Sequence, residues 1–196
     1  MKQIVFVLTL FISLLSLSCA DESNNSSTTP EITEKNYSSL GMVTKVDDTG
    51  SKITIDHEEI PNFMKAMEME FEKDPSVKVG VESIGSLINF ELSKTENGYR
   101  VVKASVATEV SPKEKYLVNC ARCHGEFGEG RLKGIPFTKG HALAHSEEEF
   151  IQTVTNGKKK MPSFRDEFSD AEIKWVVRYV RKVLQSGLKP SEKHIH

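Results

Sequence analysis

Hydrophobic and polar residues alternate in residues 39–110 and recur at helical spacing further along the chain. The alternating runs are 42–46, 53–57, 87–92 and 99–106. The sequences DDTG at 47–50 and ENG at 96–98 follow or separate such runs and are typical of tight turns. A period of two places every second side chain on one face, which is the pattern of a strand. Short strands joined by tight turns predict a small, closed antiparallel barrel.

Three helix start signals follow residue 110. Each is a capping box, in which a serine is followed three residues later by a glutamate. The boxes lie at 111–114, 146–149 and 169–172. We expect Gly157 to end the second helix and Gly187 to end the third, where apolar residues recur at helical spacing from Ile173 to Leu184. The region 111–188 is therefore predicted to be all-α, and the chain to be multidomain.

The chain begins with a single basic residue and an apolar run that ends shortly before Cys19. A run this short indicates a secretion signal and is too short to span a bilayer. The cysteine resembles that of a bacterial lipobox, although Leu17 lies one place later than in the usual pattern. We expect residues 1–19 to be a signal peptide and Cys19 to be lipidated, with cleavage without lipidation as the alternative. Residues 20–38 are rich in Ser, Asn and Thr, which predicts a flexible tether.

Charge divides the chain in the same way as the hydrophobic pattern. Acidic residues outnumber basic ones in 40–109, whereas basic residues are in excess in 110–187. The difference suggests two units with different surfaces. The net charge of −2 argues neither for nor against nucleic-acid binding. We expect no nucleic-acid partner. Residues 189–196 follow the last predicted helix as a tail.

The motif Cys120-Ala121-Arg122-Cys123-His124 carries the most specific chemistry. Two cysteines three apart, followed by a histidine, form the attachment pattern of c-type haem. The pattern predicts thioether bonds from Cys120 and Cys123 to one covalent haem c, with His124 as an axial ligand of the iron. A redox dithiol or half of a zinc site is the alternative. No second C-x-x-C occurs in the sequence, which disfavours the zinc site.

Residues 111–188 resemble a class I cytochrome c in their order of a helix, the motif, a glycine-rich loop and two more helices. In that family a methionine is the second axial ligand, and the segment NGKKKMPSF at 156–164 matches it with Met161. The resemblance also matches Pro136 with a proline whose carbonyl accepts a hydrogen bond from the ring of the axial histidine, here His124. Filled axial positions imply electron transfer rather than oxygen binding.

A second chemical pattern lies between the predicted strands of the barrel. In an extended segment at 67–72, Met67 and Met69 face one way and glutamates face the other. His57 closes a neighbouring strand. Two thioethers and one imidazole suit Cu(I) and, by the same softness, Ag(I). Methionines also serve as flexible core residues, and the pattern alone does not decide between the two roles.

The string from His57 to Phe71 resembles the CusF-like family of small periplasmic copper- and silver-binding proteins. The resemblance implies an OB-like five-stranded barrel over 39–110 and places the family's metal ligands at His57, Met67 and Met69. Glu68 stands where the family often has a threonine. Met64 lies near the position of an aromatic cap in some members, and it is left open as a fourth ligand, a cap or a bystander.

Three other groups of residues have open interpretations. His141 and His145 have the spacing of a surface metal pair, but we favour solvated polar residues. Five glutamates around the copper pattern read as a solvated acidic face or as a field that gathers cations. They are Glu58, Glu59, Glu68, Glu70 and Glu72. Lys158–Lys160 read either as a solvated loop or as a basic collar for an acidic redox partner, for which the acidic barrel itself is a candidate.

Taken together, the patterns predict an exported, membrane-anchored monohaem cytochrome fused to a Cu(I)- or Ag(I)-binding barrel. We expect it to transfer single electrons and to handle periplasmic copper, with redox partner proteins such as a copper-containing oxidase or reductase. The alternative is a copper chaperone or resistance lipoprotein whose haem senses or adjusts the redox state of copper. No nucleophile triad, paired carboxylates or phosphate-binding loop is evident, so we do not expect an enzyme.

Overall fold

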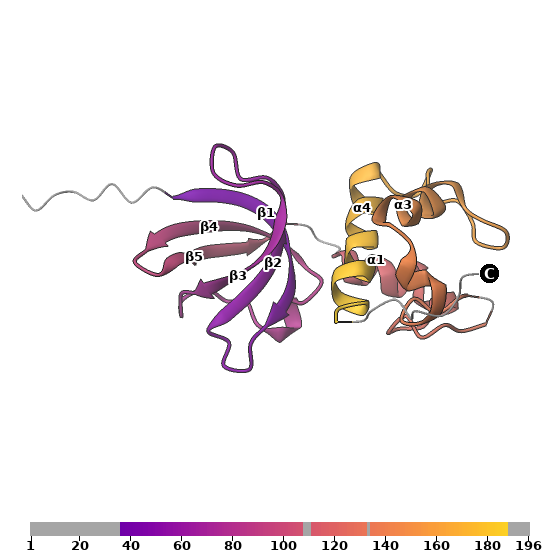
Figure 1. Cartoon of the computed structure of the whole chain (residues 1–196), viewed down its shortest axis with the longest axis horizontal. Helices are drawn as coiled ribbons and strands as arrows, with labels where there is room; N and C mark the ends of the chain where they lie inside the picture. Colours follow the sequence, from indigo (N-terminus) through magenta and orange to yellow (C-terminus); the bar gives the residue numbers. More distant parts are fainter. Residues whose placement is uncertain (1–35, 108–110, 133, 188–196) are drawn as a thin grey trace, which may run out of the picture. The chain divides into compact units, whose positions relative to one another are not determined.

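The computed structural model describes residues 36–107, 111–132 and 134–187. Strands fill the first described range and helices fill the other two (Figure 1). The predicted signal peptide, Cys19, most of the predicted tether and the tail lie outside the described residues. Among the described residues, no helix has both the length and the hydrophobicity needed to cross a bilayer.

Five strands form a closed barrel, as predicted. They are β1 (Tyr37–Val46), β2 (Lys52–His57), β3 (Met67–Lys73), β4 (Leu87–Thr95) and β5 (Gly98–Val106). Their order around the barrel is β1-β2-β3-β5-β4. The prediction of a wholly antiparallel barrel is wrong in one pair, because β3 and β5 run parallel. A closed ring of five strands cannot alternate in direction throughout, so at least one neighbouring pair must be parallel.

The barrel begins two residues earlier than predicted. Tyr37 opens β1, where it pairs with Leu92 of β4. Its ring stacks on Phe63 with centroids 4.0 Å apart and meets the edge of Tyr99 at 6.0 Å. These aromatic contacts bring the end of the predicted tether into the sheet.

The barrel interior follows the alternation of the sequence. In β2, Ile53 and Ile55 are buried in the apolar core together with Phe71 and Phe90. The next inward position of β2 is His57, which is fully buried at the end of this row. The core therefore contains an imidazole where an apolar residue would continue the pattern.

Helices follow after residue 110. They are α1 (Pro112–Asn119), α2 (Ala121–His124), η2 (Gly140–Ala144), α3 (Glu147–Asn156), α4 (Asp170–Tyr179) and η3 (Val180–Leu184); a short turn η1 (Val81–Ser83) lies in the barrel. All three predicted capping boxes are present, at Ser111, Ser146 and Ser169. In each, the serine oxygen accepts from the backbone N–H three residues on, while the glutamate accepts from the serine N–H.

The ends of the last two long helices differ. Gly157 caps α3 with a φ of 72°, as predicted. The final helix changes at Val180 into the π-helical turn η3, well before Gly187. Gln185 stabilises this change, because its N–H bonds to the Val180 carbonyl and its buried amide donates to the carbonyl of Phe137 at 2.8 Å.

One apolar cluster includes residues of both the barrel and the helices. Met42 of β1 and Leu87 of β4 share it with Tyr116 of α1 and with Trp175 and Val176 of α4. Met42 is fully buried, and Leu87 is 5% exposed. Packing of this kind ties the barrel to the helical region through hydrophobic burial.

Candidate functional site

The Cys-x-x-Cys-His motif spans the junction of α1 and α2. Cys120 caps both helices, and the His124 N–H donates to its carbonyl at 2.9 Å. Cys120 is half-buried and Cys123 is exposed. Burial, with a smaller contribution from Cys123, raises the pKa of the Cys120 thiol to about 12, so this thiol is protonated at neutral pH. Both sulfurs belong to one helical turn, as the predicted double attachment requires.

His124 is buried and oriented by two contacts. Its ring stacks on Phe137, with centroids 4.2 Å apart, and its Nδ1 lies 2.9 Å from the carbonyl oxygen of Ile135. Because a carbonyl can only accept, Nδ1 carries the proton and Nε2 keeps a free lone pair. Burial lowers the pKa of His124, and the bond to Ile135 opposes this shift less strongly. The imidazole is therefore neutral and suited to bind iron through Nε2.

The hydrogen-bond acceptor of His124 differs from the prediction. Pro136 was expected to provide the carbonyl, but the carbonyl belongs to Ile135, one residue earlier. The nitrogen of Pro136 belongs to the tertiary amide that contains this oxygen, and the proline ring fixes its own φ and favours an extended backbone at Ile135. Pro136 thus helps to orient the peptide group without being the acceptor itself.

The loop after the motif bonds back to it. The N–H groups of Gly130 and Arg131 donate to the carbonyls of His124 and Cys123 at 2.7 and 2.8 Å. A Cβ at Gly134 would lie 2.1 Å from the Cys123 carbonyl oxygen, so this close approach requires glycine. The buried hydroxyl of Tyr116 donates to the Gly125 carbonyl at 2.6 Å. These bonds hold His124 between α1 and the loop.

Exposed apolar side chains surround the motif in sequence. Of the seven large apolar residues that are exposed among the described residues, four lie between 118 and 135. They are Val118, Phe127, Leu132 and Ile135, with exposures of 77, 69, 82 and 55%. Large exposed apolar side chains that lie this close to one motif in the sequence are consistent with a binding surface. Together with two thiols and a neutral imidazole, these residues fit a haem.

Met161 lies on a tight turn attached to the end of α3. Its N–H and carbonyl exchange hydrogen bonds with Lys158 at 3.0 and 3.1 Å. The hydroxyl of Ser163 donates to the Thr155 carbonyl at 2.7 Å, which fixes the turn to the helix. Met161 is half-buried, whereas Lys158, Lys159 and Lys160 are exposed. The turn thus presents one thioether beside three cations.

His57 has an unusual environment at the end of the barrel core. Its Nδ1 lies 2.7 Å from the carbonyl oxygen of Glu58, so Nδ1 is the protonated nitrogen. Its Nε2 is buried, and it has no hydrogen-bond partner among the described residues. A buried polar atom without a protein partner is unfavourable and rare, which makes this nitrogen a candidate ligand atom. The lone pair of Nε2 fits a metal ion.

Strand register brings the predicted soft ligands to one place. Met67 lies directly opposite His57 across β2 and β3, and Met69 lies two residues further along β3. Residues at these positions share one face of the sheet and are close enough for long side chains to meet. Met67 is 46% exposed, while Met69 packs partly against the barrel core. Met64 also packs against this core, which does not decide its role.

Comparisons with known proteins match the helical region to cytochromes. The family model described as cytochrome c oxidase, cbb3-type, subunit III, matches residues 107–180. Cytochrome c6 from Leptolyngbya boryana is 36% identical over 76 residues, which cover 37% of this chain and 88% of that protein. The chain belongs to the cytochrome c family. Its cytochrome domain implies a covalently bound haem c.

The barrel matches a different family. The model described as copper binding periplasmic protein CusF matches residues 36–106, which form a CusF-like domain. The Ag(I)-bound CusF structure from Escherichia coli is 25% identical, covers 38% of this chain and 95% of that chain, and gives a TM-score of 0.35.

A cytochrome is also among the similar solved structures. The structure named KustC0563 c-type cytochrome is 26% identical, covers 37% of this chain and 95% of that chain, and gives a TM-score of 0.35.

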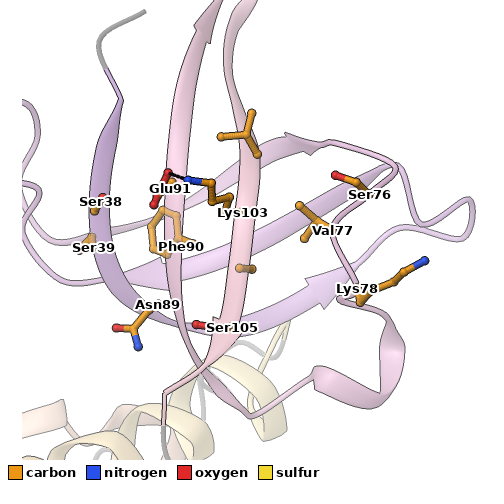
Figure 2. Close-up of a pocket in the computed structure, with 12 residues that line it drawn as sticks. Ser38, Ser39, Ser76, Val77, Lys78, Asn89, Phe90, Glu91, Lys103 and Ser105 are labelled. Carbon is orange, nitrogen blue, oxygen red and sulfur yellow. Dashed lines mark ion pairs between the residues drawn. The ribbon is translucent and has the colours of Figure 1, made fainter. Parts of the chain in front are cut away.

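A pocket in the CusF-like domain lies apart from the predicted ligands. It has a volume of about 580 Å³ and is lined by β1, β4, β5 and the loop at 76–78 (Figure 2). Figure 2 shows the ion pair between Glu91 and Lys103 beside Phe90. His57, Met67 and Met69 do not line this pocket.

The remaining predicted groups of the cytochrome domain and barrel are also placed. The rings of His141 and His145 meet edge to face at 4.5 Å, and His145 lies 3.3 Å from Glu149. No group of three or more His, Cys, Asp or Glu that could hold a metal is found within the described residues. The interpretation of His141 and His145 as solvated polar residues stays a prediction.

The acidic face of the barrel is more structured than a solvated rim. Glu70 pairs with Lys52 and Glu72 with Arg100, while Glu58 and Glu68 pair with cations of the cytochrome domain. Those cations are Lys174, Arg178 and Lys182 rather than the predicted Lys158–Lys160. Their spacing of four along one helix, with Arg178 inside an apolar stretch, was the signal that sequence reasoning missed.

Proposed function

We propose that this protein is an exported monohaem cytochrome that transfers single electrons and binds Cu(I) or Ag(I) in its CusF-like domain. The match to a model described as a periplasmic protein supports a periplasmic location. The hydrophobic N-terminal run and Cys19 support export and a lipid anchor. We assign no catalytic residue, because both domains are of electron-transfer and metal-binding kinds.

The proposed haem site uses four side chains. Cys120 and Cys123 would attach the haem through thioether bonds, and His124, through Nε2, and Met161 would hold its iron. A bound haem supplies a one-electron Fe(III)/Fe(II) couple, whose potential a thioether ligand raises. The Ile135 carbonyl holds the His124 ring in one tautomer and orientation, and Phe137 supports its face.

The proposed soft-metal site consists of His57, Met67 and Met69, with Met64 as a candidate fourth ligand or cap. The observation that carries this assignment is the buried Nε2 of His57, which has no hydrogen-bond partner in the part of the chain that the structure describes. Register places Met67 directly opposite, and thioethers with an imidazole select Cu(I) and Ag(I) over harder cations. The ligand set has no thiolate, which argues against strong zinc binding.

The proposed partners are redox proteins, and a copper-containing oxidase or reductase is the class that both domains suit. The match to a family model for a cytochrome c oxidase subunit supports this class. Lys158–Lys160 lie next to Met161 and are exposed, so they can steer an acidic partner toward that turn.

A second candidate is a copper chaperone or resistance protein whose haem senses or adjusts copper. The hydrophobic cluster that Met42 and Leu87 share with α4 favours it, because it links the two domains physically. In that role the metal is passed on or stored, and the haem responds to it.

An anaerobic titration of the haem-loaded protein with Ag(I) tests the proposal. We expect one tight Ag(I) site in the wild type, and its loss in the double variant Met67→Ala and Met69→Ala, with an unchanged haem spectrum. Tight binding that survives both substitutions would disprove the assigned ligands. Adding Cu(I) and following the haem absorbance then separates the two candidates, because a response to copper supports the sensing role.

A further inference from the structure

Three cations of the cytochrome domain bind the barrel at three carboxylates. Lys174 and Arg178 of α4 and Lys182 of η3 are spaced four residues apart, so they follow one side of the helix. The three carboxylates are Asp56, Glu58 and Glu68. Arg178 is central, because its two terminal nitrogens donate to Asp56 at 2.6 Å and to Glu58 at 2.9 Å.

Each of these carboxylates is next to a proposed metal ligand. Asp56 and Glu58 lie on either side of His57 in the sequence, and Glu68 lies between Met67 and Met69. Asp56 and Glu68 are also direct partners across β2 and β3. Neighbouring side chains of a strand point to opposite faces. The helix therefore binds one face of the two strands that carry the metal ligands on the other.

The contacts differ in how strongly they constrain the strands. The side chains of Arg178 and Asp56 are 8% and 2% exposed, and the guanidinium also lies over the Trp175 ring at 4.4 Å. Lys174 to Glu58 and Lys182 to Glu68 are longer and more exposed pairs, at 3.1 and 3.3 Å. Exposed pairs contribute little on their own, whereas a buried, two-pronged arginine fixes geometry. Arg178 should therefore contribute most to holding β2 and β3 in place.

We propose that Lys174, Arg178 and Lys182 are positioning residues that hold β2 and β3 so that His57, Met67 and Met69 bind one soft cation together. This inference rests on the proposed soft-metal site. It makes the cytochrome domain part of the metal-binding machinery without contributing a ligand. By thermodynamic linkage, metal binding then stabilises the contact between the two domains.

The direction in which Ag(I) affinity changes distinguishes a positioning role from a purely electrostatic one. Removing a positive charge near a cation site lowers the repulsion on the incoming ion, so Coulomb's law alone predicts tighter Ag(I) binding. Loss of positioning predicts weaker binding instead. The two explanations thus give opposite results for the same substitution.

The test compares Arg178→Gln with Arg181→Gln in the full-length, haem-loaded protein. Arg181 is the matched control, because it lies on the next helical turn, donates to Gln185 and lies over the ring of Phe150, both of which belong to the cytochrome domain. Ag(I) affinity is measured by competition, with the variant lacking Met67 and Met69 as background. We expect Arg178→Gln to bind Ag(I) about 5- to 100-fold more weakly, and Arg181→Gln to match the wild type.

A second measurement uses the reciprocal effect. Saturating Ag(I) should raise the thermal midpoint followed at the haem absorbance in the wild type and in Arg181→Gln, but much less in Arg178→Gln. If Arg178→Gln does not fold, Lys182→Gln replaces it, since this half-exposed side chain tolerates substitution, with a smaller expected loss of a few-fold. Unchanged or tighter binding in the folded variant overturns the inference. Absence of Ag(I) binding in the wild type overturns the proposed function instead.

Discussion

The Nδ1 atom of His57 lies 2.7 Å from the carbonyl oxygen of Glu58, while the Nε2 atom of the same ring is buried and has no partner within residues 36–107, 111–132 and 134–187. The contact with Glu58 fixes the tautomer of the ring. The lone pair of Nε2 is therefore left in the apolar core, where the ring lies next to Phe71 and Phe90. An unsatisfied buried group costs about 1–3 kcal/mol. His57 therefore lowers the stability of the barrel at a position where its free nitrogen can bind a metal ion.

Replacing this histidine should separate stability from binding. In His57→Leu, the orphaned nitrogen disappears, but the Glu58 carbonyl loses its donor. These two effects oppose each other, so the free energy of unfolding without metal should change by no more than about 1 kcal/mol. Ag(I) binding should be lost. Urea unfolding and an Ag(I) titration measure the two quantities.

The control for that measurement is Ile53→Ala, in the same inward row of β2. Removing this fully buried side chain should destabilise the protein by about 2–5 kcal/mol without removing a ligand. If His57→Leu were as destabilised as Ile53→Ala and still bound Ag(I), His57 would be an ordinary core residue.

The turn that carries Met161 depends on Gly157. Its φ of 72° suits glycine, and an added Cβ would lie 2.7 Å from the Met161 carbonyl oxygen and 2.8 Å from the Ser163 nitrogen. Gly157→Ala should therefore destabilise the protein by about 1–3 kcal/mol and displace Met161. Thermal unfolding and the thioether-to-iron charge-transfer band are the readouts.

Gly187 provides a matched control for Gly157. Its φ is 73°, but an added Cβ would meet nothing within 4 Å among the residues that the structure describes. Gly187→Ala should share the backbone strain and leave the charge-transfer band unchanged. Equal spectra in the two variants would show that Gly157 does not position Met161.

The axial role of Met161 predicts a change in potential. Met161→Ala should remove the charge-transfer band and sharply lower the reduction potential, because the thioether favours Fe(II). Met64→Ala is the control, since Met64 is also half-buried but packs in the barrel core. Spectroelectrochemistry of both variants measures the charge-transfer band and the reduction potential together. A band that persists in Met161→Ala means that another residue completes the iron coordination.

Local patterns predicted much of this structure. The three capping boxes are short-range hydrogen-bond arrangements, so Ser111 and its counterparts could be read directly from neighbouring residues. The alternation in the barrel worked for the same reason, and His57 could be assigned to the inward row. The residue that accepts from His124 was missed by one position, because the choice between Ile135 and Pro136 depends on the path of a loop.

Contacts between distant segments could not be predicted in this way. Arg178 lies 122 residues from Asp56, and only the packing of α4 brings the two together. The sequence contained a clue in the lone arginine among the apolar residues of α4, but its partners were chosen by tertiary structure. Lys158–Lys160 formed the more conspicuous basic cluster, although their side chains remain exposed.

The pKa of Glu172 predicts how the stability of the protein depends on pH. A hydrogen bond from Lys115, followed by bonds from Ser169, lowers the pKa of Glu172 from 4.5 to about 2. A lowered carboxyl pKa means that the ionised form stabilises the fold. This contribution is complete above pH 4.5 and is lost as the pH falls toward 2. Because the side chain is 40% exposed, solvent screening keeps it to about 0.5–1 kcal/mol.

Glu172→Gln isolates the charge, since glutamine can still accept the capping bond from Ser169. The variant should be less stable than the wild type at pH 7, and the difference should shrink between pH 4.5 and 3 and at high salt. Urea midpoints across this range measure it, with the exposed Glu167→Gln as a control that should match the wild type throughout. A deficit in Glu172→Gln that stayed constant down to pH 3 would mean that the cap, rather than the ion pair with Lys115, had been lost.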